Sequence, residues 1–409
     1  MAPKDYGLFS VFAALIAVFI VLREEFDALF LGFFMFVGLV IAIYSSEKAV
    51  KGMELLGEKL GLTPYVAGVL SSLASNTPEL VIGFFAVFSG QAEFAIAFII
   101  IATGFNILML GILVVIGNIT RKGPIKVPNE VIEVEVPIVR VAIVMIGSIF
   151  VLGIVLFALE ALEAAKTGET LIPYMPYEAS LITVLVYLLY LYFIIKHNLK
   201  EQAGRLKASA ADMNVGEGEG EEARVVTNKV MLTAILVLAF VFIFFAGEMI
   251  SSSVELFLHL DSNTIELNEF QLAFLIGAAA SIPEHAIALL AVRHEGGIEL
   301  GMGNLIAGSM QNLLLMTGLV SLFSYVAAVM GIAGNVVDGI PLIHQVPGEV
   351  PIPFLLVQFG FAWLLLFLIK SSMTDNAELD IYEGLTITIA QLFVFIIFLQ
   401  AILGVKFFG

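Results

Sequence analysis

The chain has 409 residues, of which 60% are hydrophobic and only 13% are charged, and its mean hydropathy is +1.03. Soluble globular proteins carry roughly 25% charged residues, so most of the surface of this chain must face lipid. The net charge of −17 argues against nucleic acid as a partner, and the absence of cysteine excludes disulfides, thiolate metal sites and thiol nucleophiles.

Long apolar runs follow one another along the chain and predict membrane-spanning helices. A bilayer core of about 30 Å needs roughly 20 apolar residues in a helix. Eleven runs approach or exceed this length: 7–22, 27–44, 64–89, 91–117, 136–159, 178–196, 230–250, 269–292, 299–331, 350–370 and 384–403. The ninth is long enough to hold a kink. The sequence therefore predicts an all-α polytopic membrane protein with about 11 transmembrane helices.

The first apolar run does not have the pattern of a cleavable signal. Lys4 stands beside Asp5, no small-residue cleavage site follows, and the run leads through charges into a second apolar run. If the N-terminus is cytoplasmic, only Arg23, Lys166 and Lys406 of the 19 lysines and arginines fall on the far side. The positive-inside rule thus predicts a cell-membrane protein with its N-terminus inside and its C-terminus outside.

Three segments of the first half resemble three segments of the second half, in the same order. The pairs are 45–56 with 246–257, 74–87 with 279–292, and 103–113 with 309–319. Because an odd number of spans per copy turns the second copy over, this pattern predicts an inverted repeat, typical of secondary transporters. Chance similarity between apolar segments is the alternative, and the two matching Pro-Glu dipeptides argue against it.

One polar segment divides the two copies. It contains the acidic, glycine-rich stretch DMNVGEGEGEEAR, which lacks the ligand spacing of an EF-hand and is typical of a solvated linker rather than a Ca²⁺ sensor. The predicted organisation is an extra N-terminal helix (1–26), a first five-helix repeat (27–196), an acidic cytoplasmic linker (197–229) and a second five-helix repeat (230–409).

The two Pro-Glu dipeptides place carboxylates deep inside predicted spans. Glu79 and Glu284 each lie about fifteen residues into an apolar run. A charged residue at the bilayer centre costs at least ~2.5–3.5 kcal/mol, so such residues are functional candidates. A helix end at the membrane interface is the alternative, which the apolar residues on both sides of Glu79 disfavour.

The prolines of these motifs provide further oxygen atoms. Pro78 and Pro283 have no N–H, which frees the carbonyl groups of Ala74 and Ala279, four residues back. Side-chain oxygens on the same turns come from Ser75, Asn76 and Ser281. Two such half-sites meeting head-on give about six to eight oxygens, a set that suits Ca²⁺ and not a thiolate or imidazole metal.

Amide side chains recur at matching places in the following spans. Asn106 lies 27 residues after Glu79, and Gln311 and Asn312 follow Glu284 at nearly the same distance. These amides could ligand an ion or hold the carboxylates in place. Hydrogen bonding between helices is the alternative, since Asn and Gln often serve that role in membranes.

At these residues the chain resembles the calcium/cation antiporter superfamily. Members have two repeats of five helices, each with a glutamate in its second helix, and the resemblance covers about residues 27–403. The resemblance implies that Glu79 and Glu284 bind the transported Ca²⁺. It implies no cofactor beyond the transported ions, which are Ca²⁺, H⁺ and, in one branch, Na⁺.

The motifs divide between two branches of that superfamily. Sodium/calcium exchangers typically show Pro-Glu in both repeats, as here, but also later serines that are replaced by Ala102 and Gly308. Proton/calcium exchangers typically show Glu-His and Ser-x-Gln, which match Glu284-His285 and Ser309-Met310-Gln311. Eleven helices and an acidic central segment also favour the proton branch, and the prolines keep the sodium branch open.

The charge balance of a two-carboxylate site favours the same function. An empty site carries two negative charges, and either one Ca²⁺ or two protons neutralise it; only a neutral site crosses a low-dielectric barrier at low cost. We therefore expect a secondary-active Ca²⁺/H⁺ antiporter with alternating access, in which Glu79 and Glu284 couple to protons. His285 either relays protons or packs between helices.

Other residues and other functional classes have less support in the sequence. Glu47 and Glu248, at matching places in the repeats, are interfacial residues or line an entry path. No diphosphate, zinc-protease or nucleophile-elbow motif supports an enzyme. A cation channel would normally assemble its filter from several subunits or repeats. The oligomeric state is left open.

Overall fold

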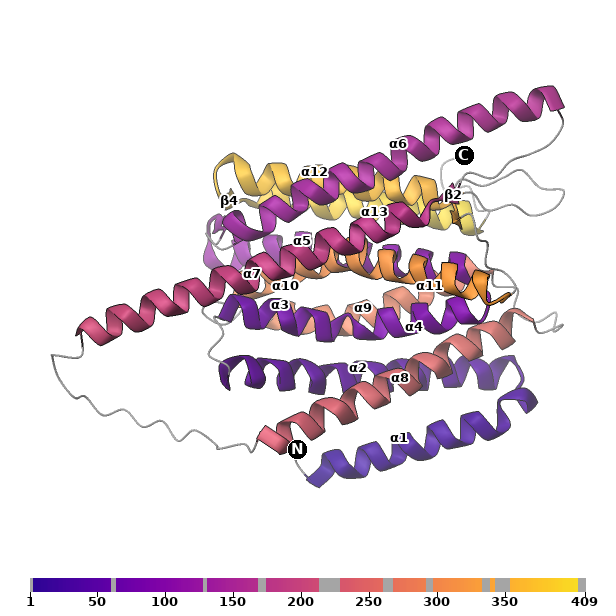
Figure 1. Cartoon of the computed structure of the whole chain (residues 1–409), viewed down its shortest axis with the longest axis horizontal. Coiled ribbons are helices and arrows are strands. Elements are labelled where there is room, and N and C mark those ends of the chain that lie inside the picture. The colour runs from indigo at the N-terminus through magenta and orange to yellow at the C-terminus, as the bar shows by residue number, and fades with distance from the viewer. Residues whose placement is uncertain are drawn as a thin grey trace.

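The computed structural model describes residues 3–59, 64–127, 131–167, 174–212, 229–259, 268–291, 297–332, 339–342 and 354–403. Figure 1 shows long helices packed side by side. The first half contains α1 (Pro3–Leu22), η1 (Arg23–Glu25), α2 (Ala28–Lys59), α3 (Pro64–Ser75), α4 (Thr77–Phe88), α5 (Ala92–Arg121), β1 (Ile125–Lys126), the π-helical turn η2 (Val131–Glu135), α6 (Val136–Thr167), β2 (Tyr174–Met175) and α7 (Tyr177–Asp212). The second half contains α8 (Lys229–Leu258), α9 (Glu269–Ala291), α10 (Gly297–Met310), the π-helical turn η3 (Gln311–Met316), α11 (Thr317–Val329), β3 (Ile340–Pro341), α12 (Phe354–Asp375), β4 (Glu378–Leu379) and α13 (Ile381–Leu403).

These helices confirm the predicted all-α polytopic membrane fold. Within the described ranges, eight helical stretches are long and apolar enough to cross a bilayer, and shorter apolar helices cover Gly7–Leu22, Thr77–Phe88 and Glu269–Ser281. Every one of the predicted apolar runs contains helical structure. The exact number of crossings stays a prediction.

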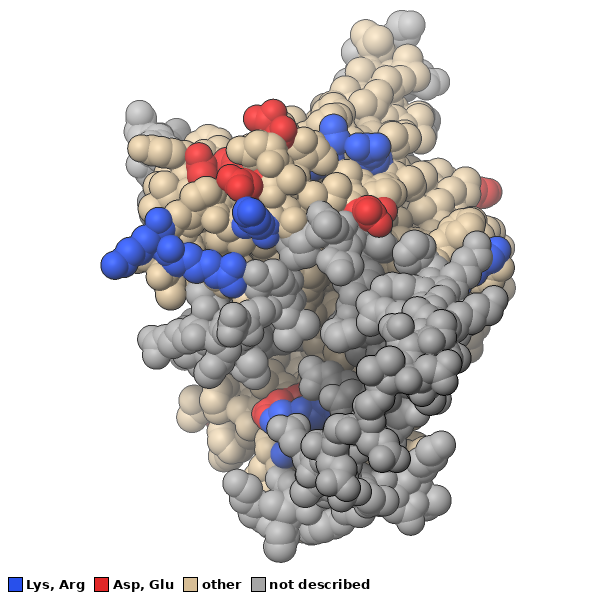
Figure 2. Space-filling model, turned by 90° about the vertical axis from the view of Figure 1, so that its left-hand side faces the viewer, with Lys and Arg blue, Asp and Glu red and all other residues tan. Residues whose placement is uncertain are grey.

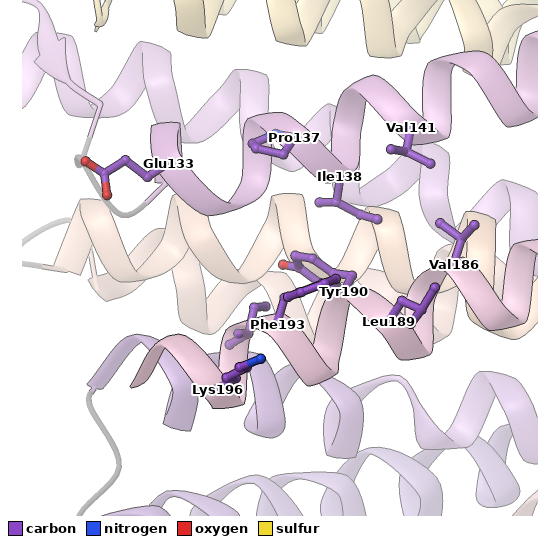
Figure 3. Close-up of a pocket in the computed structure, with 10 residues that line it drawn as sticks. Glu133, Pro137, Ile138, Val141, Val186, Leu189, Tyr190, Phe193 and Lys196 are labelled. Carbon is purple, nitrogen blue, oxygen red and sulfur yellow. The ribbon is translucent and has the colours of Figure 1, made fainter. Parts of the chain in front are cut away.

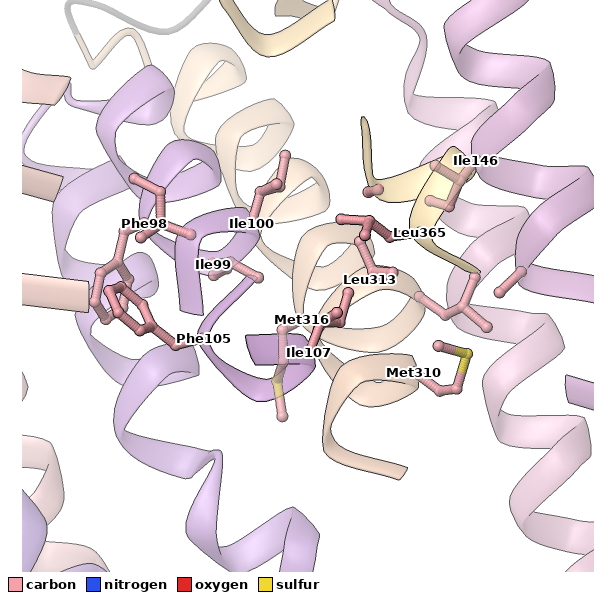
Figure 4. Packing of buried hydrophobic residues seen from close by; sticks show 14 of the residues in the cluster. Phe98, Ile99, Ile100, Phe105, Ile107, Ile146, Met310, Leu313, Met316 and Leu365 are labelled. Atoms are coloured by element: carbon pink, nitrogen blue, oxygen red, sulfur yellow. The ribbon is translucent and has the colours of Figure 1, made fainter. Parts of the chain in front are cut away.

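Helix α5 forms the centre of the bundle. Its most apolar window is 83% buried inside the protein, whereas the windows of α6 and α7 are only 33% buried. Figure 4 shows Ile107 of α5 beside Leu313 and Met316 of η3. Since lipid is as apolar as these side chains, close packing and not water exclusion holds such helices together.

The pairing of elements relates the two halves. Helix α2 packs against α8, and α6 packs against α12. The contact between α5 and α13 corresponds to the contact between α11 and α7. Two short antiparallel ladders join β1 to β4 and β2 to β3. This is the pattern expected if each element of one half has a counterpart in the other. The boundaries of the two repeats stay a prediction.

Helix α1 lies on the outside of α2 and α8. Its rings contact theirs, with centroids 4.6 Å apart for Phe9 and Phe242. At the far end of α1, the Arg23 guanidinium lies 3.2 Å from the Glu248 carboxylate and donates to the Ser252 hydroxyl at 3.3 Å. Glu248, an interfacial or entry-path residue by sequence, therefore ties the extra helix to the second half. Its counterpart Glu47 pairs with Lys51 on its own helix.

We expect Arg23→Gln to destabilise the protein more than Glu248→Gln. The Glu248 side chain is only 22% exposed, so it would keep a poorly hydrated charge, whereas an unpaired Arg23 can extend to water. A loss of about 1 kcal/mol is expected for Arg23→Gln, with recovery in the double variant. Thermal unfolding in detergent measures this, with Lys51→Gln as the exposed control. Equal melting temperatures for wild type and Arg23→Gln would contradict it.

Candidate functional site

The first Pro-Glu motif lies at a break between two helices. The single predicted run 64–89 is divided at Asn76, which has φ −87° and ψ 2° and separates α3 from α4. Pro78 has no N–H to donate, and the bond from the Leu80 N–H to the Asn76 carbonyl is long, at 3.4 Å. The Thr77 hydroxyl donates to the Leu73 carbonyl at 2.9 Å. The regular backbone hydrogen-bond pattern of the helix is therefore interrupted one turn before Glu79.

Glu79 is a buried carboxylate in the first turn of α4. Its side chain is 3% exposed, and α4 packs against α5, α8 and α11. Within the described part of the chain, Oε2 of Glu79 has no hydrogen-bond partner and no Lys or Arg pairs with it. A buried polar atom without a partner calls for an explanation such as a bound ion or a proton.

Gln311 connects the break in the first half to η3 in the second half. Its Oε1 accepts hydrogen bonds from Asn76 Nδ2 at 2.8 Å and from Ser72 Oγ at 3.1 Å. Its Nε2 donates to the Val69 carbonyl at 3.3 Å. A carbonyl oxygen has two lone pairs, so these bonds satisfy it. In the structure Gln311 therefore holds Asn76 in place.

Asn312 lies beside Gln311 in the π-helical turn η3. It is fully buried, and among the described residues neither its Oδ1 nor its Nδ2 has a partner. The Thr317 hydroxyl donates to the Asn312 carbonyl at 2.8 Å, and the Thr317 N–H bonds the same oxygen five residues back. Such π-helical turns occur frequently at functional sites.

Gly308 of α10 lies where two buried amides meet. A Cβ atom added there would lie 3.1 Å from Asn106 Nδ2 and 3.3 Å from Asn76 Nδ2. Asn106, on α5, is 2% exposed, and its Nδ2 has no partner among the described residues. The structure thus brings α3, α5 and α10 together at one point. Gly308, at the position of a serine that is typical of sodium/calcium exchangers, leaves room for both amides.

The remaining residues of the first motif and of α10 are engaged differently. Ser75 is buried and its hydroxyl donates to the Ser72 carbonyl at 3.0 Å, while its own carbonyl accepts from Ser46 Oγ at 3.3 Å. Ser309 donates to the Leu305 carbonyl at 2.8 Å. Ala74 is 2% exposed. Each hydroxyl oxygen keeps lone pairs that can accept a further bond or an ion.

The second motif is only partly described. Ser281 on α9 is 1% exposed, and its hydroxyl has no partner among the described residues. Ala279, two residues earlier, is partly buried. The side chains of Pro283, Glu284 and His285 lie outside the described residues. Helix α9 continues through Pro283, whereas the chain breaks between α3 and α4 near Pro78. Helix α9 packs against α5 and α10. In the first half, α4 packs against α5 and α3 packs against α10.

Sequence reasoning missed two residues of this site. Ser72 is four residues before Asn76 and so shares its helix face, a spacing that could have identified it. Tyr187 of α7 is fully buried beside Gln311 and Glu135, and no local pattern marks it. The described residues hold no group of three or more His, Cys, Asp and Glu that could bind a metal.

Comparison with known proteins identifies the family. The family model described as sodium/calcium exchanger protein matches residues 30–196 and 231–403. The chain is therefore an ion exchanger by family, a class of membrane transporter and not of enzyme. It belongs to the sodium/calcium exchanger protein family, which confirms the resemblance drawn from the Pro-Glu motifs.

Two curated relatives match over a shorter length. The chain is 30% identical over 118 residues to CaxA of Alkalimonas amylolytica, which carries the name of an antiporter, and 27% identical over 114 residues to the inner membrane protein YrbG of Escherichia coli K12. The matches span 29% and 28% of this chain and only 35% and 34% of those relatives.

Solved structures share the whole fold at low identity. The crystal structure of the H⁺/Ca²⁺ exchanger CAX has a TM-score of 0.63 at 14% identity and covers 99% of this chain and 94% of that one. A structure of the sodium-calcium exchanger NCX_Mj has a TM-score of 0.54 at 15% identity and covers 90% of this chain and 99% of that one. Both support the arrangement of helices.

We expect Gly308→Ala to weaken ion binding without unfolding the protein. The new methyl group must displace the Asn76 and Asn106 amides by a few tenths of an ångström, and misplaced supporting groups typically lower metal affinity about 10–100-fold. Gly303→Ala is the matched control, because a Cβ at Gly303, on the same helix, meets no atom within 4 Å. Ca²⁺ titration of both variants measures the effect, and equal affinities would contradict it.

Proposed function

We propose that this chain is a secondary-active Ca²⁺/H⁺ antiporter with alternating access at a site that contains Glu79 and Glu284. The observation that carries the proposal is the Glu79 carboxylate, 3% exposed and without a partner for Oε2 in the described residues. A carboxylate in such a place must bind a cation or take up a proton, because an isolated buried charge is very costly. Both of these are the proposed substrates.

Buried oxygen atoms without partners support a hard cation as the ligand. Among the described residues these include Oε2 of Glu79, Oδ1 of Asn312 and Oγ of Ser281. Amide, hydroxyl and carboxylate oxygens are the ligands that Ca²⁺ prefers. The proposed ion site comprises Glu79, Glu284, Asn106, Asn312 and Ser281, with supporting oxygens from Ser75, Asn76, Ala74, Ala279 and Ser309. Gln311 contributes by holding Asn76 in place.

Proton exchange follows from charge balance. With no described cationic side chain paired to Glu79, the charge of the two glutamates is left to the transported ions. One Ca²⁺ or two protons then give the same net charge, so one ion replaces the other during the cycle. His285 is proposed as an accessory proton carrier next to Glu284.

A sodium/calcium exchanger is the second candidate. The Pro-Glu dipeptides are typical of the sodium branch, and the NCX_Mj fold is similar. The proton branch is favoured because Gln311, its characteristic amide, is the acceptor that binds Asn76 and Ser72. The CAX structure also covers more of this chain, at 99% against 90%.

We further propose a cytoplasmic N-terminus and an outside C-terminus. The order of the helices places the start of α1 and the end of α13 at opposite ends of the bundle. The helix order places Lys48, Lys51, Arg121, Lys122 and Lys126 at the end where α1 begins. Figure 2 views this end and shows Lys and Arg gathered there among Asp and Glu. The positive-inside rule makes it the cytoplasmic end.

We expect Ca²⁺ uptake into proteoliposomes to follow an imposed pH gradient in the absence of Na⁺. Glu79→Gln and Glu284→Gln should each abolish uptake. A neutral amide cannot release a proton, and it cannot bind Ca²⁺ as a carboxylate does. Glu178→Gln, an exposed glutamate in the first turn of α7, is the control and should transport normally.

The same preparation separates the two candidates. Uptake driven only by a Na⁺ gradient at fixed pH would assign the chain to the sodium branch. Wild-type uptake in Glu79→Gln would contradict the proposed site in either branch. Conductance far above the turnover of a carrier would identify a channel.

A further inference from the structure

A groove opens on the outer surface of α6 and α7. Its volume is about 680 Å³, within the range of about 300–1,000 Å³ that is common for ligand pockets. Figure 3 shows it between the two helices, with Glu133 and residues of α6 on one side and residues of α7 on the other. Most of the wall is apolar, including Val141, Leu189 and Phe193.

The wall of this groove faces the surroundings of the protein at membrane depth. Leu189 is 56% exposed and Phe193 is 60% exposed, although both lie inside the apolar stretch Tyr177–Lys196. Only 33% of the apolar windows of α6 and α7 is buried. Since this surface lies within the hydrocarbon layer, the molecules available to fill the groove are lipids.

One end of the groove carries a pair of opposite charges. Glu133 lies near the start of the stretch Val131–Leu159 and Lys196 ends the stretch Tyr177–Lys196, so both lie at the same membrane surface. Figure 3 shows both at the same end of the groove. The Lys196 ammonium lies 5.4 Å from the centroid of the Tyr192 ring. Arg140, exposed on α6, does not line the groove.

We propose that this groove binds one phospholipid that has a zwitterionic headgroup with a primary amine, of the phosphoethanolamine type. An acyl chain lies along the apolar wall, the phosphate contacts the Lys196 ammonium, and the headgroup ammonium donates to the Glu133 carboxylate. The two side chains carry one charge of each sign, which matches a zwitterion. An anionic headgroup would leave Glu133 facing negative charge, and a quaternary ammonium has no N–H to donate.

Native mass spectrometry of the full-length protein, purified in mild detergent and mixed with equal amounts of phosphatidylethanolamine, phosphatidylcholine and phosphatidylglycerol, tests this site. The expected result is one retained phosphatidylethanolamine per chain. Glu133→Gln should reduce its preference over phosphatidylcholine about tenfold, the effect of losing one charge-assisted hydrogen bond. Lys196→Gln should weaken retention of all three lipids. Arg140→Gln, a control on α6 that does not line the groove, should change nothing.

Leu189→Trp, which fills the groove without changing its charges, provides an independent variant and should prevent retention. Equal retention of the three lipids, or a preference that both charge variants leave unchanged, would overturn the proposal. Preferred retention of phosphatidylglycerol would instead assign an anionic lipid. A mass of two chains that disappears in Leu189→Trp would make the groove an interface between copies. Because no ion gradient enters the measurement, its outcome is independent of the transport proposal.

Discussion

A carboxylate removed from water needs a positive charge or a proton, and among the described residues Glu79 has no cationic partner. The surrounding structure depends on this constraint. Membrane helices cannot leave such a charge in lipid, so α4 is enclosed by α5, α8 and α11. The polar side chains that meet around Asn76, three residues before Glu79, are neutral amides and a hydroxyl, which cannot neutralise the glutamate. The charge balance of the site is therefore left to whatever ions enter it.

A second feature connects the site to the two halves of the chain. Gln311 of η3 accepts bonds from Asn76 and Ser72, more than 230 residues earlier in the sequence. These bonds join the break after α3 to a π-helical turn, two places where the regular backbone pattern is interrupted. Interrupted helices at mid-membrane are common where transporters bind their ions, because carbonyls there are not all used within the helix. Under the proposed function, an ion bound at this site can act on both halves through the Gln311 side chain.

Much of this arrangement could be predicted from the sequence, and the limits have physical causes. Apolar runs of the right length identify the helices, and a glutamate inside such a run identifies Glu79, because both follow from the cost of burying charge in lipid. The break at Asn76 was not predicted, and α9 continues through Pro283. A proline fixes which backbone hydrogen bond is lost, whereas tertiary packing decides whether the helix breaks. The partners of Gln311 depend on that packing too, and hence no local pattern shows them.

The most direct test of the central claim is the number of protons released when the purified protein binds Ca²⁺ in weakly buffered, Na⁺-free detergent solution. If one site takes either Ca²⁺ or protons, saturation with Ca²⁺ should release about two protons per ion at a pH where the empty site is protonated. Glu79→Gln should abolish this release. Saturable Ca²⁺ binding by the wild type with no proton release at any pH would contradict the account.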